Sequence, residues 1–376
     1  MAVAGERPYG EGKWMVEVRM RWVLVLALLA LGGVAAVVSA PGGLHVVDAA
    51  AGAAAAPAAA AVGAAVGAAV GAPVAGSVPV AAPDVVLASA EAGAAEQPAA
   101  SVIPADPRLE IAPVAARPLD LRIILSGHSL TDPMGQALPR LVRAAGGAGD
   151  RIALSTIPGA PMDWRWNNRT HPPDAREDIA GFDVMVQTER VSLSGTRPWH
   201  NSDDEALRWA RHGWENGAGG QGAEVLLYAS WVTLDTGPGF DTHGDADLAL
   251  PWRARLDREF AAWEEIMNHV NANRPEGAAQ MRMIPATLVM AAVYDAIERG
   301  DAPEGLDDIR QLFTDDIHLT PLGAWLVALT HYAVVYARDP RGLPGPEGAT
   351  QALVDWAPAL VWQVVTGYPG TGVQDG

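Results

Sequence analysis

Two short segments, far apart in the chain, carry the residue types that nucleophilic acyl transfer needs. Ser129 follows the apolar run 121–125 and precedes a helical pattern, which predicts a strand-to-helix turn at its position. His318 lies three residues after Asp315, just ahead of another helical pattern. A serine hydroxyl becomes a nucleophile when a histidine takes its proton and a carboxylate orients that histidine. The pattern therefore predicts Ser129 as the nucleophile, His318 as the base and Asp315 as the residue that orients the base.

Both motifs also have ordinary structural interpretations. A serine at such a turn is a common helix N-cap, and a histidine ahead of a helix can simply bond to the backbone. Asp316 is a second carboxylate beside Asp315, but its side chain projects differently, so Asp315 is the first choice. The occurrence of both motifs at the two ends of one domain favours the catalytic interpretation.

The elements that must position these residues follow from the hydrophobic pattern. Continuous apolar runs alternate with amphipathic stretches, which is typical of a parallel sheet covered by helices on both faces. We predict strands over residues 121–126, 151–157, 182–188, 224–229 and 282–286. We predict helices over residues 134–145, 203–215, 251–271, 288–299 and 321–337. The expected fold is α/β, a doubly wound five-stranded parallel sheet with its binding crevice at the carboxyl ends of the strands.

The first 118 residues have a different composition. A basic flank precedes the apolar run 22–38, which is typical of a secretory signal peptide or an uncleaved signal anchor. Pro41 would hinder cleavage directly before it, so both outcomes stay open. Residues 41–118 are mostly Ala, Val, Gly and Pro, and they cannot bury enough apolar area to offset the entropy of ordering. We expect an extracytoplasmic protein, periplasmic or secreted, with possible anchoring to the inner membrane by residues 22–38.

These observations divide the chain into four parts. They are a signal peptide or signal anchor (1–40), an Ala/Pro/Gly-rich disordered linker (41–118), a catalytic domain (119–340) and a C-terminal extension with a helix (341–376).

Composition excludes several classes of function. The formal net charge of −18 argues against nucleic acid or an anionic membrane surface as a partner. The absence of cysteine excludes disulfides, thiolate metal sites and a cysteine nucleophile. The acidic loop 241–247 lacks the ligand spacing of a zinc or calcium site. We therefore expect no metal.

The two chemical motifs resemble the conserved blocks of the SGNH hydrolases, also called GDSL esterases or lipases. Gly127-His128-Ser129-Leu130 resembles the first block, and the segment 315–320, Asp-Asp-Ile-His-Leu-Thr, resembles the Asp-x-x-His block. The resemblance covers roughly residues 121–340. It implies a flavodoxin-like three-layer sandwich, a Ser/His/Asp triad and ester hydrolysis without a cofactor. It also implies that the backbone N–H groups of Ser129 and Gly159 hold the oxyanion.

The chain departs from the family pattern at Glu189, which stands where the family has an asparagine that donates to the oxyanion. A carboxylate donates no hydrogen bond unless it is protonated. Three explanations are open. Glu189 pairs with Arg190 or binds a substrate hydroxyl; Asn201 or the N–H of Gly159 is the donor; or catalysis is weak or lost. The last explanation gives an alternative function, a catalytically impaired glycan-binding protein with the same fold.

Tryptophans after the predicted strands indicate the substrate. The chain has 13 Trp against 4 Phe, and Trp164, Trp166, Trp199 and Trp231 fall in predicted loops. Flat aromatic faces beside polar side chains suit stacking on sugar rings, although they can equally anchor the loops. The sequence thus predicts an exported or membrane-tethered serine esterase that acts on a small ester or an acylated carbohydrate, with O-acetyl groups as the favoured target.

Overall fold

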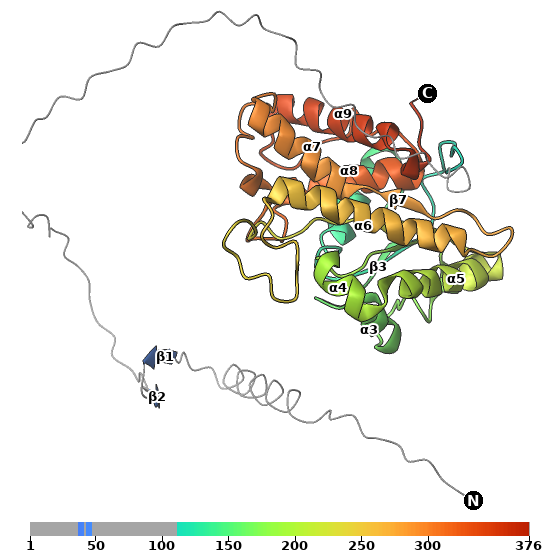
Figure 1. The fold of residues 1–376 in the computed structure, drawn as a ribbon. Helices are drawn as coiled ribbons and strands as arrows, with labels where there is room; N and C mark the ends of the chain where they lie inside the picture. The colour runs from blue at the N-terminus through green and yellow to red at the C-terminus, as the bar shows by residue number, and fades with distance from the viewer. Residues whose placement is uncertain (1–36, 41–42, 47–110, 376) are drawn as a thin grey trace, which may run out of the picture. The chain divides into compact units, whose positions relative to one another are not determined.

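The computed structural model describes residues 37–40, 43–46 and 111–375 (Figure 1). The chain divides into two units, Met1–Ala95 and Glu96–Gly376. In the first unit, β1 (Val37–Ala40) and β2 (Gly43–Val46) pair as antiparallel strands. Apart from these strands and residues 111–118, the expected signal segment and linker lie outside the described residues. Among the described helices, none combines the length and apolarity needed to cross a membrane.

The second unit is built on a five-stranded parallel sheet, which confirms the predicted fold class. Its strands are β3 (Ile123–Gly127), β4 (Ile152–Thr156), β5 (Val184–Gln187), β6 (Glu224–Tyr228) and β7 (Arg282–Ile284). They lie in the order β4-β3-β5-β6-β7, and every neighbouring pair is parallel. The chain order reverses between β3 and β5, so the crevice of this fold lies at the carboxyl ends of these two strands.

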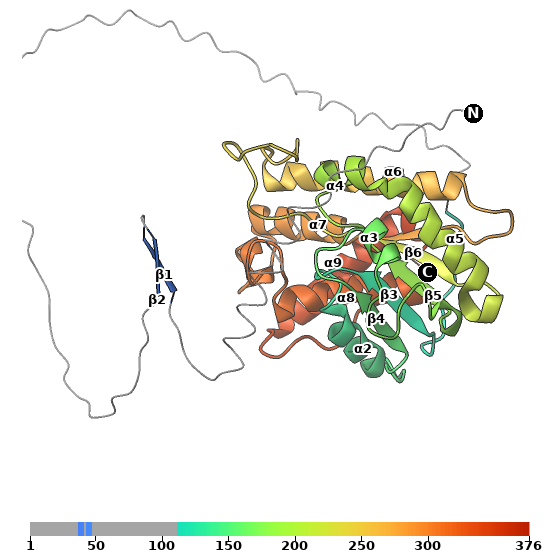
Figure 2. The ribbon, with the colours of Figure 1, turned by 90° about the horizontal axis from the view of Figure 1, so that it is seen from below.

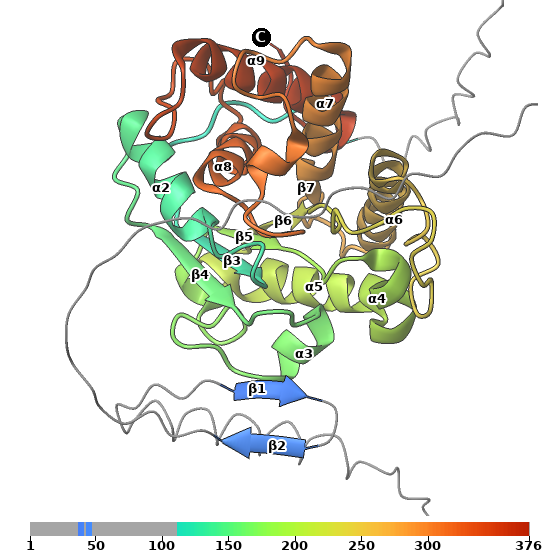
Figure 3. The ribbon, with the colours of Figure 1, turned by 90° about the vertical axis from the view of Figure 1, so that its left-hand side faces the viewer.

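Helices cover both faces of the sheet (Figure 3). Successive strand residues point to opposite faces, so Ile123 and Leu125 belong to one core cluster and Ile124 to another. The first cluster includes residues of α2 (Met134–Ala144), α7 (Ala286–Arg299), α8 (Pro321–Tyr336) and α9 (Gln351–Gly367). The second includes residues of α3 (Met162–Asn167), α4 (Leu193–His200), α5 (Ser202–Gly220) and α6 (Trp252–Ala272). Short 3-10 helices are η2 (Ile179–Gly181), η3 (Ile309–Leu312) and η4 (Pro369–Thr371).

Helix α8 is apolar on almost every side because it is enclosed by other elements. It contacts α2, α7, α9 and β7, and Figure 2 also shows it beside α2. The Thr320 hydroxyl accepts a hydrogen bond from the Gly323 N–H, and Pro321 occupies the first turn, so the start of α8 is well defined. His318 lies just ahead of this start and is therefore held by one of the most buried helices of the molecule.

Segments on both sides of the expected catalytic domain also pack on it. The N–H of Val114 donates to the carbonyl of Gly372, and the N–H of Arg117 donates to that of Tyr336. Ile111 is buried, and α9 packs against α7 and α8. The packed unit therefore extends from residue 111 to the C-terminal segment, because these flanking residues cover its apolar surface.

Candidate active site

Ser129, His318 and Asp315 form one hydrogen-bonded chain. The Oγ of Ser129 lies 3.0 Å from Nε2 of His318, and Nδ1 of His318 lies 2.8 Å from Oδ2 of Asp315. Ser129 and His318 are partly exposed, and Asp315 is exposed, so solvent and substrate can reach them. The serine and the histidine, 189 residues apart in sequence, thus meet at the end of β3.

A tight turn after β3 places Ser129. The N–H of Thr131 donates to the carbonyl of His128 at 2.8 Å, so the chain reverses directly around Ser129. A Cβ on Gly127 would lie 2.0 Å from Oγ1 of Thr131, so only glycine fits at that position.

The Asp315 carboxylate is held from both sides. Its Oδ1 accepts hydrogen bonds from the backbone N–H groups of His318 and Ile317, at 2.6 and 2.9 Å, while its Oδ2 faces the imidazole. These hydrogen bonds lower the pKa of Asp315 to about 2. The carboxylate is therefore charged at neutral pH and holds the Nδ1–H tautomer of His318, which leaves Nε2 free to accept the serine proton.

Asp316, the second-choice carboxylate, supports this loop and does not face the imidazole. Its Oδ2 accepts from the Thr233 hydroxyl at 2.6 Å, and its carbonyl accepts from the Leu234 N–H. Trp231 is fully buried, and its Nε1–H donates to the carbonyl of Ile317 at 2.9 Å. Trp231 therefore holds the loop that carries His318 in place from the protein interior, and it does not line the crevice. Sequence reasoning missed this supporting role.

The backbone N–H groups of Ser129 and Gly159 are free to hold an oxyanion. Gly159 follows β4 with a φ of +67°, in open space, a conformation that favours glycine. Within residues 111–375, the N–H groups of Ser129 and Gly159 donate no hydrogen bond. Because β3 and β4 are neighbours, with Gly127 paired to Thr156, both N–H groups lie near the same end of the sheet. Unpaired N–H groups in such a place are what a developing oxyanion requires.

Glu189 is a buried structural residue. Its Oε1 accepts hydrogen bonds from the N–H groups of Met162 and Arg190, at 2.9 and 2.6 Å. Burial raises the pKa of Glu189, and the positive charge of Arg165 opposes that rise. The expected partner Arg190 therefore contributes its backbone, and the charge facing Glu189 belongs to Arg165.

Arg165 and His128 complete a buried network around Glu189. The Arg165 guanidinium donates to the carbonyls of Ala160, at 2.7 Å, and Thr188. Nε2–H of His128 donates to the carbonyl of Glu189 at 3.0 Å, and burial lowers the pKa of His128 to about 4, so the ring is neutral at pH 7. Since Ala160 directly follows Gly159, this network holds the turn that carries the candidate oxyanion donor.

The remaining predicted site residues are not brought to the triad by any hydrogen bond. Asn201 lies at the junction of α4 and α5, where its Nδ2 donates to Asp204 at 3.0 Å. Trp166 packs edge-on against Trp209, with the Arg208 guanidinium 4.3 Å from the centre of its ring.

Trp164 and Trp199 remain on the surface, with 52 % and 79 % of their areas exposed. They lie on α3 and α4, short helices where loops were expected, and His200 Nδ1 lies 3.0 Å from Asp163 Oδ2 between these helices. Short helices show too few turns for a clear helical period, which explains the difference.

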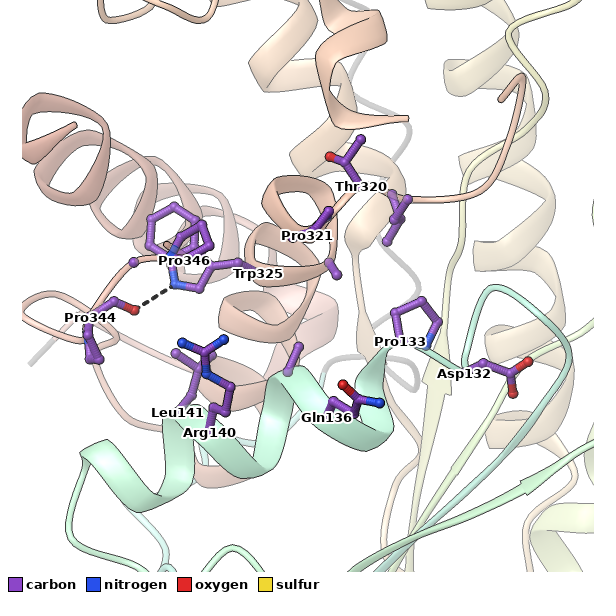
Figure 4. Close-up of a pocket in the computed structure, with 14 residues that line it drawn as sticks. Asp132, Pro133, Gln136, Arg140, Leu141, Thr320, Pro321, Trp325, Pro344 and Pro346 are labelled. Carbon is purple, nitrogen blue, oxygen red and sulfur yellow. Dashed lines mark hydrogen bonds between the residues drawn. The ribbon is translucent and has the colours of Figure 1, made fainter. Parts of the chain in front are cut away.

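A pocket of about 350 Å³ lies between α2 and α8 (Figure 4). Asp132, three residues after Ser129, and Leu319, directly after His318, are among its lining residues. In the described part of the chain, no group of three or more acidic or histidine side chains is arranged to hold a metal ion.

No family model matches the chain, and no curated protein matches it. Among solved structures, it is similar to a DUF4886 family protein from Bacteroides uniformis, at 15% identity over 67% of this chain and 96% of that one, with a TM-score of 0.48. A protein from Parabacteroides merdae assigned as a GDSL-like lipase is 13% identical over 60% and 97%, with a TM-score of 0.37. The acetyl xylan esterase AlAXEase is 14% identical over 57% and 98%, also at 0.37. Likenesses this distant identify neither an activity nor a substrate for this chain.

Proposed function

We propose that this chain is a serine ester hydrolase of the SGNH type. The observation that carries the proposal is the hydrogen-bonded chain from Ser129 through His318 to Asp315, at 3.0 and 2.8 Å. In this mechanism Oγ of Ser129 attacks the ester carbonyl carbon while Nε2 of His318 takes the hydroxyl proton. Asp315 stabilises the imidazolium that forms. The N–H groups of Ser129 and Gly159 donate to the oxyanion.

The second half of the reaction uses the same groups. The tetrahedral intermediate collapses, the ester C–O bond breaks, and His318 returns its proton to the departing alcohol oxygen. Water then attacks the acyl-enzyme, with His318 again as base, and the acid leaves as Ser129 regains its proton.

The buried position of Glu189 supports an active enzyme over the impaired alternative. Its Oε1 receives two backbone hydrogen bonds, and the positive charge of Arg165 acts on the carboxylate, so its negative charge is partly compensated inside the protein. Labelling with a fluorophosphonate probe tests the proposal. Folded wild-type protein is expected to react, and Ser129→Ala is expected to lose the label while keeping its thermal transition. Folded wild-type protein that takes no label but binds oligosaccharides would favour the glycan-binding alternative.

We further propose O-acetylated carbohydrate as the substrate class. The exposed rings of Trp164 and Trp199, on helices joined by His200 and Asp163, support a sugar-stacking surface. The Trp164→Ala/Trp199→Ala double variant is expected to lose kcat/KM on a partially acetylated oligosaccharide more than on p-nitrophenyl acetate. An equal effect on both substrates would contradict this substrate class.

The proposed location is extracytoplasmic, with residues 22–38 as signal peptide or membrane anchor, and it rests on sequence alone. Fractionation of cells that produce the full chain tests it. Recovery in the cytoplasm with an unprocessed N-terminus would contradict it.

A further inference from the structure

The pocket between α2 and α8 has no part in the mechanism above, yet its lining begins three residues after Ser129 and one residue after His318. Its two walls come from the helices that follow the two catalytic segments, because α2 follows Ser129 and α8 follows His318. A volume of about 350 Å³ lies within the range of small-molecule sites.

The walls of the pocket are mainly apolar. Ala324 and Trp325 of α8 face the loop residues Pro344 and Pro346. The Trp325 Nε1–H donates to the carbonyl of Pro344 at 3.0 Å, as the dashed line in Figure 4 marks, so the indole nitrogen is already satisfied. The surface that remains suits a flat or compact apolar group.

Arg140 gives the pocket a charged end. It is the one cationic side chain among the lining residues, and Figure 4 shows its guanidinium rising from α2 toward α8. Its side chain is exposed, and within residues 111–375 it makes no hydrogen bond or ion pair with another side chain. Asp132, at the end of the pocket near Ser129, is already bonded to the Thr156 hydroxyl at 2.6 Å. A free guanidinium at the end of an apolar pocket fits a carboxylate, which it can bind with two parallel hydrogen bonds.

The mechanism proposed for the triad indicates which half of an ester, acyl or alcohol, would occupy the pocket. His318 must return its proton to the departing alcohol oxygen, so the alcohol half lies on the His318 side of Ser129. Leu319 and Thr320, which line the pocket, directly follow His318. This adjacency makes the pocket the candidate for holding the alcohol half.

We propose that this pocket binds the alcohol half of the substrate, a compact ring that carries a carboxylate paired with Arg140. The proposal rests on the ester hydrolase activity proposed above and specifies its substrate. Arg140 lies about 10 Å along the axis of α2 from the N-cap Pro133, so the carboxylate is expected at the end of the alcohol half remote from the ester oxygen. The chain carries a net charge of −18, so a preference for an anionic substrate would report a local contact and not the overall field.

Two acetate esters test the pocket: 3-(4-acetoxyphenyl)propanoate and its methyl ester. They share the acetyl group and the phenol oxygen, and they differ in the distant charge. We expect wild-type protein to prefer the carboxylate about tenfold in kcat/KM, the value of one charge-assisted hydrogen bond. Arg140→Gln is expected to abolish the preference. Arg143→Gln removes the same charge from the same helix outside the pocket and is expected to keep it.

A second pair, an O-acetylated methyl glucuronoside and its methyl ester, separates the two sources of such an alcohol. A larger Arg140-dependent preference in the sugar pair identifies a sugar acid, and a larger one in the phenolic pair identifies an aromatic acid. Either result supports the pocket.

The failure of this proposal is distinguishable from the failure of the hydrolase. Hydrolysis of both members of each pair at equal kcat/KM, or a preference that survives Arg140→Gln, overturns the pocket and leaves the hydrolase standing. If no ester is hydrolysed, calorimetric titration with 3-(4-hydroxyphenyl)propanoate decides. Binding that Arg140→Gln weakens about tenfold supports the pocket without the hydrolase, and absence of binding overturns both.

Discussion

Replacing Asp315 with asparagine tests whether its carboxylate sets the tautomer of His318 that accepts the proton of Ser129. The side-chain carbonyl that Asp315→Asn introduces would still accept the backbone N–H groups of Ile317 and His318, so the loop is expected to stay folded. The new NH₂ group, however, would face Nδ1 of His318 and favour the tautomer with the proton on Nε2. That tautomer cannot take the proton of Ser129.

The size of the effect follows from the lost charge. A carboxylate close to a forming imidazolium near a protein surface stabilises it by about 4 kcal/mol. Asp315 is exposed, so solvent screening reduces this contribution to roughly 1 kcal/mol, and the loss of the Nδ1–H tautomer adds about 2–3 kcal/mol. Because each 1.36 kcal/mol is a factor of ten, Asp315→Asn is expected to lower kcat by about 10²- to 10³-fold.

The assay is the initial rate of p-nitrophenyl acetate hydrolysis at pH 7.5, about neutral, where Asp315 is ionised. Asp316→Asn is the matched control. It removes one negative charge from the same loop, but from a carboxylate that accepts from Thr233 and does not face His318. It is expected to change kcat less than tenfold. Equal losses in both variants, or a loss under tenfold in Asp315→Asn, would refute the orienting role.

Three further changes test the surroundings of the site. Glu189→Asn shortens the side chain that accepts from two backbone N–H groups, so ester turnover should fall; a large gain would show that Glu189 obstructs the oxyanion. Arg165→Met removes the buried hydrogen bonds to the carbonyls of Ala160 and Thr188 and should lower the free energy of unfolding by about 3–5 kcal/mol in urea titrations; an unchanged free energy would contradict this role. Gly159→Ala, at φ +67°, should cost about 1–2 kcal/mol and lower kcat, whereas Gly181→Ala, in equally open space at an ordinary φ, should do neither.

The fold could be predicted from sequence because its signals are local. Strands buried on both faces appear as continuous apolar runs, such as Ile123 to Leu125, and the helices between them carry their own period. The start of α8 is equally predictable, because Thr320 is a favourable N-cap and Pro321 a favourable first-turn residue.

The supporting structure of the site could not be predicted, because it depends on contacts between distant residues. Nothing near Glu189 in sequence shows that its carboxylate turns inward, since its partners Met162 and Arg165 lie on α3, more than 20 residues earlier. The role of Trp231 depends likewise on Ile317, 86 residues away. An apolar side chain after a strand predicts burial but not which carbonyl its N–H will find.

Ser129 is expected to form a covalent acyl intermediate during turnover. Protein quenched in acid during turnover of a slowly hydrolysed p-nitrophenyl ester, then digested and analysed by mass spectrometry, tests it most directly. We expect one acyl group per chain, on the peptide that contains Ser129, and none in His318→Ala. Turnover without a trapped acyl group, or an acyl group on another residue, would contradict it.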